Sequence, residues 1–465
     1  MSDSFDLVVI GGGPAGLAAA VQACEFGLSV ALVDEQPEPG GQIYRVVERA
    51  EAEGRARGLG DDYRRGLDLV NAFRACGATH FASHQVWQVE SDGRVFTSDG
   101  TTSRQIDGKR VLVAVGAMER PVPVRGWTLP GVMTVGAAQI LHKSIDLLPE
   151  PEVWIAGSGP LLLHFAAEVV EAGARIAGIL DTTRSSISRA FMAHGTGALR
   201  GWRYLAKGLG YLRKIRMANI RRVTGVEAVE AKGDSQIDRV RWRVGSHWEE
   251  APAKGLLLHE GIIPNTHMTM SLGCAHVWDA QQQCFRPLTD AYGATDVGTI
   301  AVAGDCGGIG GARVAECRGR LAALGIAAAL GCITDEERDH RSEPVRREFD
   351  THDAIRNFLD ALYAPAPELL APPDDVVVCR CEGVTAGRSR EAVALGCRGP
   401  NQVKSFTRCG MGPCQGRMCG PAVTGTIAAA LDTLPGTVGS FRVRPPLKPL
   451  RLGELAALGD GESAE

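Results

Sequence analysis

Cysteines in the last quarter of the chain have a spacing that could bind a metal centre. Cys379 and Cys381 form a CxC pair and Cys409 and Cys414 form a Cx4C pair, with 27 residues between the two pairs. Four thiolates can hold a [2Fe-2S] cluster, and the glycines around them leave backbone N–H groups free to hydrogen-bond its sulfurs. We therefore predict these four cysteines as ligands of a [2Fe-2S] cluster.

Alternatives to this assignment stay open. Structural zinc usually takes cysteines separated by about two to four residues, so the CxC pair counts against zinc without excluding it. Disulfides are less expected, because the chain begins without the basic and apolar regions of a signal peptide. Within the iron–sulfur assignment, Cys419 could replace Cys414, and Cys397 is the weakest candidate.

A glycine-rich loop near the start has the pattern of a dinucleotide-binding fingerprint. Gly11, Gly13 and Gly16 follow the strand-like run FDLVVI and open a helical segment. In that pattern the first glycine makes a tight turn, the second admits a pyrophosphate, and the third lets helix and strand pack closely. With Pro14 and Ala15 the loop would hold phosphate at the N-terminus of the helix.

An acidic residue stands where such a fold binds ribose. Asp34 lies 23 residues after Gly11, at the end of the next strand-like run, and Glu35 is the neighbouring candidate. A second loop keeps Gly157 and Gly159 but has Leu162 in the third position, which should push the helix away from the strand. We therefore regard NAD(P)H binding at the second loop as doubtful.

Repeated strand, glycine turn and helix patterns must position these residues. Two such units start about 146 residues apart, and hairpin-like segments lie between them. The proline-rich run APAPELLAPPDD then separates the cysteine-rich module. We predict an α/β fold with two Rossmann-like dinucleotide-binding domains and a small, mainly helical C-terminal [2Fe-2S] domain. The expected divisions are a first domain in two parts (1–125 and 285–345), a second domain (126–284), a linker (346–375), the cysteine module (376–440) and an extended tail (441–465).

Composition limits the classes of function. The 465 residues are 45% hydrophobic and 22% charged, which suits a globular protein, and the formal charge of -4 gives no reason to invoke nucleic acid. The longest apolar run without charge has 13 residues, short of the roughly 18 needed to span a bilayer. We expect a cytoplasmic protein without a transmembrane segment.

One segment is strongly basic. From Arg184 to Arg222 there are ten Lys or Arg residues and no Asp or Glu. This segment could be a solvated helical face, could dock an acidic partner, or could hold a phosphate-bearing cofactor at a subunit interface. Arg184 could also accept a 2′-phosphate, but it could equally be a surface residue.

Several motifs resemble those of the flavoproteins with two dinucleotide-binding domains. The loop PGGQIYR contains Gly41 and Gln42, the run VLVAVGA ends near Gly116, and TIAVAGD contains Asp305. The resemblance implies FAD along these residues, with Asp305 on the ribityl chain and the backbone near Val86 on the adenine. The paired cysteines of the disulfide reductases are missing from the PGGQIYR loop and the second domain, so thiol–disulfide chemistry is disfavoured.

The order of modules resembles that of the larger flavoprotein subunits of opine oxidase and hydrogen cyanide synthase and of related hydroxyproline dehydrogenases, with a C-terminal domain like bacterioferritin-associated ferredoxin. GGQIYR, GWTLPGVMTVGAAQ and RCGMGPCQGR carry this resemblance; the ferredoxin family commonly ends in CxxC, whereas Cx4C stands here. The resemblance to these flavoprotein subunits implies an electron-relay role next to a flavoprotein partner of the amine-oxidase type. A small ferredoxin-like subunit, an FMN or other nucleotide at a subunit interface, and peripheral association with the inner face of the membrane are further options.

We nominate no catalytic residue, because no convincing acid–base pair or nucleophile is visible in the sequence. His164, Glu168, His259 and His267 are more often core or surface residues than catalysts. The competing hypotheses are a self-contained NAD(P)H-dependent flavin oxidoreductase and a scaffold with empty nucleotide folds.

Overall fold

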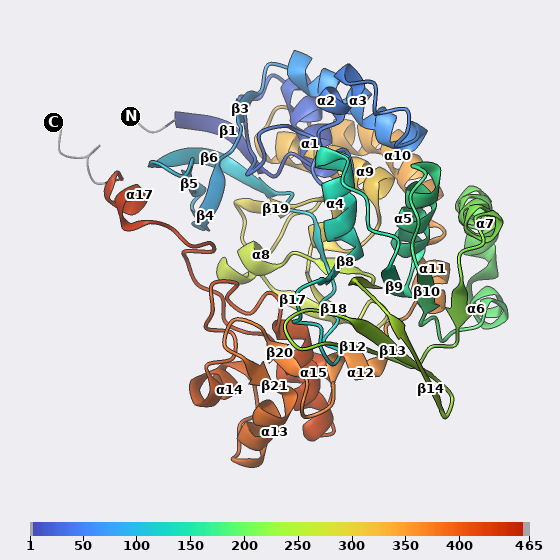
Figure 1. Ribbon diagram of the computed structural model, residues 1–465. Helices are drawn as coiled ribbons and strands as arrows, with labels where there is room; N and C mark the ends of the chain where they lie inside the picture. The colour runs from blue at the N-terminus through green and yellow to red at the C-terminus, as the bar shows by residue number, and fades with distance from the viewer. Residues whose placement is uncertain (1–2, 459–465) are drawn as a thin grey trace.

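The computed structural model describes residues 3–458 and is built around two sheets, the first of mixed and the second of parallel strands (Figure 1). The first sheet has the order β3-β2-β1-β6-β5-β4, and β19 also pairs with β6. Its strands are β1 (Asp3–Ile10), β2 (Val30–Val33), β3 (Thr79–Phe81), β4 (Gln85–Val89), β5 (Arg94–Ser98), β6 (Ser103–Val113) and β19 (Ile300–Val302). Since β19 lies far along the sequence, the chain returns to its first sheet after building the second.

Helices cover one face of this sheet, where the apolar side chains of Leu7, Val9 and Leu32 cluster with those of the helices. They are α1 (Pro14–Glu25), α2 (Val47–Ala52), α3 (Asp61–Ala75) and α9 (Ala312–Ala329), and α10 (Asp335–Asp353) packs on α9. Helix α1 packs closely on α9, and a Cβ at Gly319 would lie 2.1 Å from the carbonyl oxygen of Ala15. A glycine is therefore required where the two helices meet.

The second sheet is wholly parallel, with the order β11-β10-β9-β15-β8. Its strands are β8 (Val132–Thr134), β9 (Val153–Ser158), β10 (Gly178–Asp181), β11 (Arg222–Thr224) and β15 (Gly255–Glu260). Its helices are α4 (Val135–Ile145), α5 (Pro160–Glu171), α6 (Ile187–Arg200) and α7 (Trp202–Met217). An antiparallel sheet of β12 (Ala228–Lys232), β13 (Arg239–Val244) and β14 (His247–Pro252) joins it through Trp242, whose ring lies 5.1 Å from that of Trp154.

Short elements connect the two sheets. The crossing strands β7 and β16 pair with each other, and β17 pairs with β18. These elements are β7 (Ala117–Glu119), β16 (Ile262–Pro264), α8 (His267–Ser271), β17 (His276–Asp279), β18 (Cys284–Pro287) and the 3-10 turn η1 (Gly304–Gly307).

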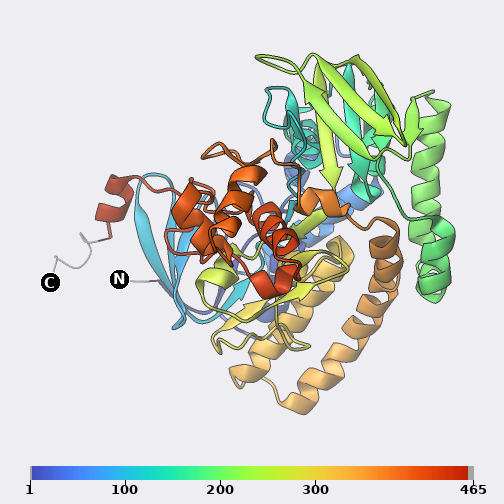
Figure 2. The ribbon, with the colours of Figure 1, turned by 90° about the horizontal axis from the view of Figure 1, so that it is seen from below.

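The C-terminal part is mainly helical and lies against both sheet units (Figures 1 and 2). Its elements are α11 (Arg356–Leu362), α12 (Pro367–Leu370), β20 (Val377–Cys379), β21 (Val384–Thr385), α13 (Ala386–Ala394), α14 (Pro400–Thr407), α15 (Gly420–Ala430), α16 (Pro435–Val438) and α17 (Leu452–Ala456). Helices α10, α11 and α12 occupy much of the segment expected to be a linker, and α11 packs on α6. The α/β fold class predicted from the sequence is confirmed.

The tail after the cysteine module returns to the first sheet. Val443 and Leu447 are buried in its core, and the backbone N–H of Leu447 donates to the carbonyl of Trp87 at 2.7 Å. Among residues 3–458, no helix has both the length and the apolarity to cross a membrane.

Candidate functional site

The first glycine loop presents an uncapped helix N-terminus. Gly11 has φ +106°, and a Cβ at Gly16 would lie 1.9 Å from the carbonyl oxygen of Gly11. Gly13 is the N-cap of α1, followed by Pro14, and no side chain caps the helix. The free N–H groups of the first helical turn can therefore bind a phosphate group.

Asp34 holds this loop from the next strand. Its carboxylate accepts hydrogen bonds from the N–H of Gly12 at 2.6 Å and from the N–H of Gln36 at 2.8 Å. Burial raises the pKa of Asp34, although both hydrogen bonds oppose that shift. Glu35, the neighbouring candidate, forms an ion pair with Lys448 of the C-terminal tail.

The PGGQIYR loop packs directly on the first glycine loop. A Cβ at Gly41 would lie 2.7 Å from the Cα of Gly13, so only glycine allows this approach. Arg45 donates to the side-chain oxygens of Gln42 at 2.9 Å and Gln36 at 2.7 Å. Arg45 is a phosphate-binding candidate that we did not single out from the sequence, although it stands in the quoted motif.

The remaining predicted residues line the same unit. Asp305 accepts hydrogen bonds from the N–H groups of Gly310 at 2.9 Å and Gly311 at 3.0 Å, just before α9. Gly116 has φ +66° with open space where a Cβ would stand. Val86 lies on β4 and is buried.

The second loop differs from the first at its third position. Leu162 is buried in a core that packs on the second sheet, so α5 cannot approach the strand as α1 does at Gly16. The strand-end acid Asp181 is ion-paired with Arg222, and Arg184 pairs with Glu368 at 3.0 Å. The two side chains that could recognise the ribose or 2′-phosphate of NAD(P), those of Asp181 and Arg184, therefore form ion pairs within the chain.

A buried polar cluster, which we did not foresee, lies between α4, α5 and the PGGQIYR loop. Lys143 is 4% exposed and donates to the carbonyl of Ile43 at 3.1 Å, and burial lowers its pKa to about 8. Gln139 donates to Glu168 at 2.7 Å, and burial lowers the pKa of His164 to about 4. A lysine in an amphipathic helix normally faces solvent, so the sequence held no signal for this burial.

The cysteine module gathers five sulfurs. The Sγ atoms of Cys379, Cys409 and Cys419 all lie within 4.8 Å of one another, and all three residues are buried. Beside them, the sulfurs of Cys381 and Cys414 lie 3.8 Å apart and are more accessible. The structure therefore places two of the predicted cysteines, Cys379 and Cys409, in one group with the alternative Cys419, and pairs the other two with each other.

The surroundings of Cys379 favour a thiolate. Hydrogen bonds from the thiols of Cys409 and Cys419, with backbone N–H groups of Gly410 and Glu382, lower the pKa of Cys379 to about 2. Low-pKa thiolates are the form that binds metal. All of these donors are cysteine sulfurs, and cysteine thiolates are the ligands of iron–sulfur clusters. The donor set therefore fits such a cluster.

One close contact inside the cysteine module and two hydrogen bonds to its surroundings hold it in place. Within the module, a Cβ at Gly412 would lie 2.8 Å from the sulfur of Cys381, so that turn needs glycine. His267 donates to the carbonyl of Gln415 at 3.1 Å, and burial lowers the pKa of His267 to about 4, so the ring is neutral at pH 7. Trp127 donates to the carbonyl of Val377 at 2.6 Å.

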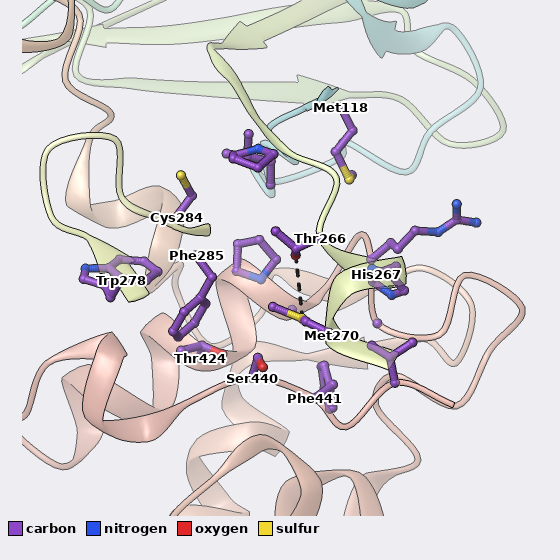
Figure 3. Close-up of a pocket in the computed structure, with 17 residues that line it drawn as sticks. Met118, Thr266, His267, Met270, Trp278, Cys284, Phe285, Thr424, Ser440 and Phe441 are labelled. Atoms are coloured by element: carbon purple, nitrogen blue, oxygen red, sulfur yellow. Dashed lines mark hydrogen bonds between the residues drawn. The ribbon is translucent and has the colours of Figure 1, made fainter. Parts of the chain in front are cut away.

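A cavity of about 70 Å³ separates the cysteine loop from the crossing strands (Figure 3). Met118 and Cys284 lie on one side of it, and Phe441 lies on the other. Thr266 donates to the sulfur of Met270 at 3.6 Å across its floor. The lining of this cavity is mostly apolar, so the cavity has a low dielectric constant.

Comparisons with known proteins agree with this architecture. Residues 5–319 match the pyridine nucleotide-disulphide oxidoreductase family, and residues 377–459 match the sarcosine oxidase A3 domain. The solved structure of L-proline dehydrogenase from P. horikoshii has the same fold, with a TM-score of 0.71 and 19% identity over 98% of this chain and 80% of that chain.

Two curated relatives are similar along their whole length. The A subunit of opine oxidase from Rhizobium meliloti (strain 1021) is 44% identical over 462 residues, which cover 98% of this chain and 99% of the relative. The HcnB subunit of hydrogen cyanide synthase from Pseudomonas aeruginosa is 32% identical over 470 residues, covering 97% and 98%. These findings confirm the resemblance inferred from the motifs. The chain belongs to the pyridine nucleotide-disulphide oxidoreductase family, with the A subunit of opine oxidase and the HcnB subunit of hydrogen cyanide synthase among its relatives.

Proposed function

We propose that this chain is an electron-transfer subunit, carrying FAD and a [2Fe-2S] cluster, of a heteromeric dehydrogenase or oxidase. The substrate class is an amino acid or an opine-like secondary amine. The observation that carries the proposal is the gathering of five sulfurs in a chain that resembles the A subunit of opine oxidase from end to end.

FAD is the cofactor that the family implies, and the first glycine loop fits it. The free N–H groups of the first turn of α1, beginning with that of Ala15, and the Arg45 guanidinium would hold the pyrophosphate, and Asp34 would bind the adenosine ribose. Gly41, Gln42, Gly116 and Asp305 would line the rest of the cofactor.

The predicted ligand set remains our proposal for the cluster. Cys379, Cys381, Cys409 and Cys414 would hold it, and Cys419 is the alternative to Cys414 because it lies in the buried group of three. When bound, FAD accepts two electrons together while a [2Fe-2S] cluster passes them singly. The chain's own part is to hold both groups.

The partners belong to the same proposal. A flavoprotein subunit of the amine-oxidase type would dehydrogenate the substrate, and a small ferredoxin-like subunit could complete the complex. A further nucleotide such as FMN would sit at a subunit interface, and the complex would work in the cytoplasm or at the inner face of the membrane.

The proposal is tested by purifying the native complex and extracting its cofactors. We expect about one FAD, two iron atoms and two acid-labile sulfides per copy of this chain, together with a second flavoprotein. A complex without iron, or a chain that purifies alone and oxidises NADH through its flavin, would overturn it.

A further inference from the structure

Helices α6 and α7 carry an unusual concentration of exposed apolar side chains. Eight of the twenty large apolar side chains that are exposed in the described chain lie within these two helices. The helices stand at one edge of the molecule in both ribbon views (Figures 1 and 2). The eight residues are Ile187, Phe191, Met192, Leu199, Trp202, Tyr204, Leu209 and Met217.

The basic residues of this segment fall into two groups. Five are ion-paired within the chain, namely Arg184, Lys207, Lys214, Arg221 and Arg222. The other five have no acidic group within 4.0 Å in residues 3–458, and all of them are arginines. These are Arg189, Arg200, Arg203, Arg213 and Arg216.

Exposed apolar side chains and arginines without an acidic partner share one face of α7. At 100° per residue, Trp202, Leu209, Arg213, Arg216 and Met217 fall within one outward stripe. The opposite side of the helix is anchored by Ile215, which is buried on α5. Apolar and cationic groups therefore alternate on the surface that faces away from the molecule.

This alternation favours a protein partner over a membrane. A helix that lies on a bilayer separates its apolar residues from its cations onto different faces. Protein interfaces are instead enriched in Trp, Met, Phe and Arg and depleted of Lys, Asp and Glu, and the outward stripe of α7 has Trp, Met and Arg without Lys, Asp or Glu. Because the unpaired arginines are positively charged, we expect carboxylates opposite them on the partner.

We infer that α6 and α7 form the docking surface for a companion protein whose own surface interleaves carboxylates with apolar side chains. The inference rests on the proposed function only in requiring a companion subunit, and it does not depend on either cofactor.

A photo-crosslinking residue at Leu209 tests the inference in the native complex. Leu209 is 67% exposed, so the substitution disturbs no core contact. We expect crosslinks to a companion subunit that co-purifies in fixed ratio, on a peptide that contains Asp or Glu. Crosslinks to phospholipid, nucleic acid or a second copy of this chain, or the absence of crosslinks, would overturn the inference.

A charge reversal provides the second test. The R213E/R216E variant should bind the companion protein about tenfold or more weakly, while its flavin and iron contents stay as in the wild type. The matched control is R57E/R347E, which reverses two exposed arginines that also have no acidic partner in the described chain. Wild-type affinity in R213E/R216E would refute the docking surface. A complex that assembles normally but lacks flavin and iron would refute the proposed function instead.

Discussion

The five sulfurs of the cysteine module differ in burial, and this difference bears on which of them bind metal. Cys379 accepts hydrogen bonds from two neighbouring thiols and two backbone N–H groups. We expect Cys379→Ser to lose iron and acid-labile sulfide while keeping the flavin spectrum, because the flavin residues belong to a separate sheet unit. Metal analysis and absorbance spectra of the purified variant check this, and loss of FAD together with iron would show that the two parts fold as one.

The ligand set is decided by two further variants. If Cys414 is the fourth ligand, Cys414→Ser should lose the cluster and Cys419→Ser should keep it. The reverse result would place Cys419 in the ligand set, as the tight grouping of its sulfur with Cys379 and Cys409 allows. Retention of iron in both variants would contradict ligation by either residue.

His164 should make the stability of the chain depend on pH. Burial lowers its folded pKa to about 4, below the unfolded value of about 6.5, so its contribution is complete above pH 6.5 and is lost as the pH falls toward 4. In His164→Asn the amide oxygen can still accept from Gln139 but does not titrate.

Denaturant unfolding at pH 7 and pH 5 measures this effect. We expect the wild type to lose roughly 1–2 kcal/mol more than His164→Asn between the two pH values. Lys143 and Glu168 face the same cluster, and Oε1 of Glu168 lies 3.6 Å from Nε2 of His164, so any change in the titration of Glu168 is part of the measured difference. Equal losses in the two proteins would show that folding does not shift the pKa of His164.

Single residues were predictable from the sequence where the chemistry is local. The spacing of Gly11, Gly13 and Gly16 and of the cysteines is a property of short segments. Lys143 and Arg45 were not singled out, because their environments are made by segments that meet only in the folded chain. Asp181 is likewise held by Arg222, an arginine 41 residues away in the sequence.

At the scale of elements, the close approach of α1 to β1 depends on one glycine. A Cβ at Gly16 would meet the carbonyl oxygen of Gly11, so Gly16→Ala should destabilise the chain by about 1–3 kcal/mol and lower its FAD content. Thermal unfolding and flavin absorbance measure both effects. Gly208→Ala is the control, because no neighbour lies within 4 Å of that site in α7, and it should raise stability by up to about 1 kcal/mol. Similar changes in both variants would rule out the steric argument.

The main elements of both sheet units were predictable because apolar runs, glycine turns and helical periodicity occur in order along the chain. The segment 346–375 shows the limit of that approach. Its charge and prolines indicated a linker, yet α11 forms there because Phe358 and Leu362 find an apolar surface on α6. The return of the tail to Trp87 likewise depends on contacts that sequence patterns do not reveal.

At the scale of the whole molecule, the second dinucleotide unit differs from the first at the positions that would bind a nucleotide. Leu162 prevents the close helix–strand approach, and Asp181 and Arg184 are ion-paired. We therefore expect no prompt flavin bleaching when the isolated chain is mixed rapidly with NADH or NADPH. Full reduction within the mixing time would support the stand-alone oxidoreductase instead.

The central claim is that a flavin held by the first glycine loop exchanges electrons with iron held by the cysteine module. Electron paramagnetic resonance of the native complex, frozen after mixing with its amine substrate, tests it most directly. The account predicts that the flavin absorbance falls and the signal of a reduced [2Fe-2S] cluster rises in the wild type, with the signal absent in Cys379→Ser. Substrate oxidation that reduces the flavin but never produces a cluster signal in the wild type would contradict it.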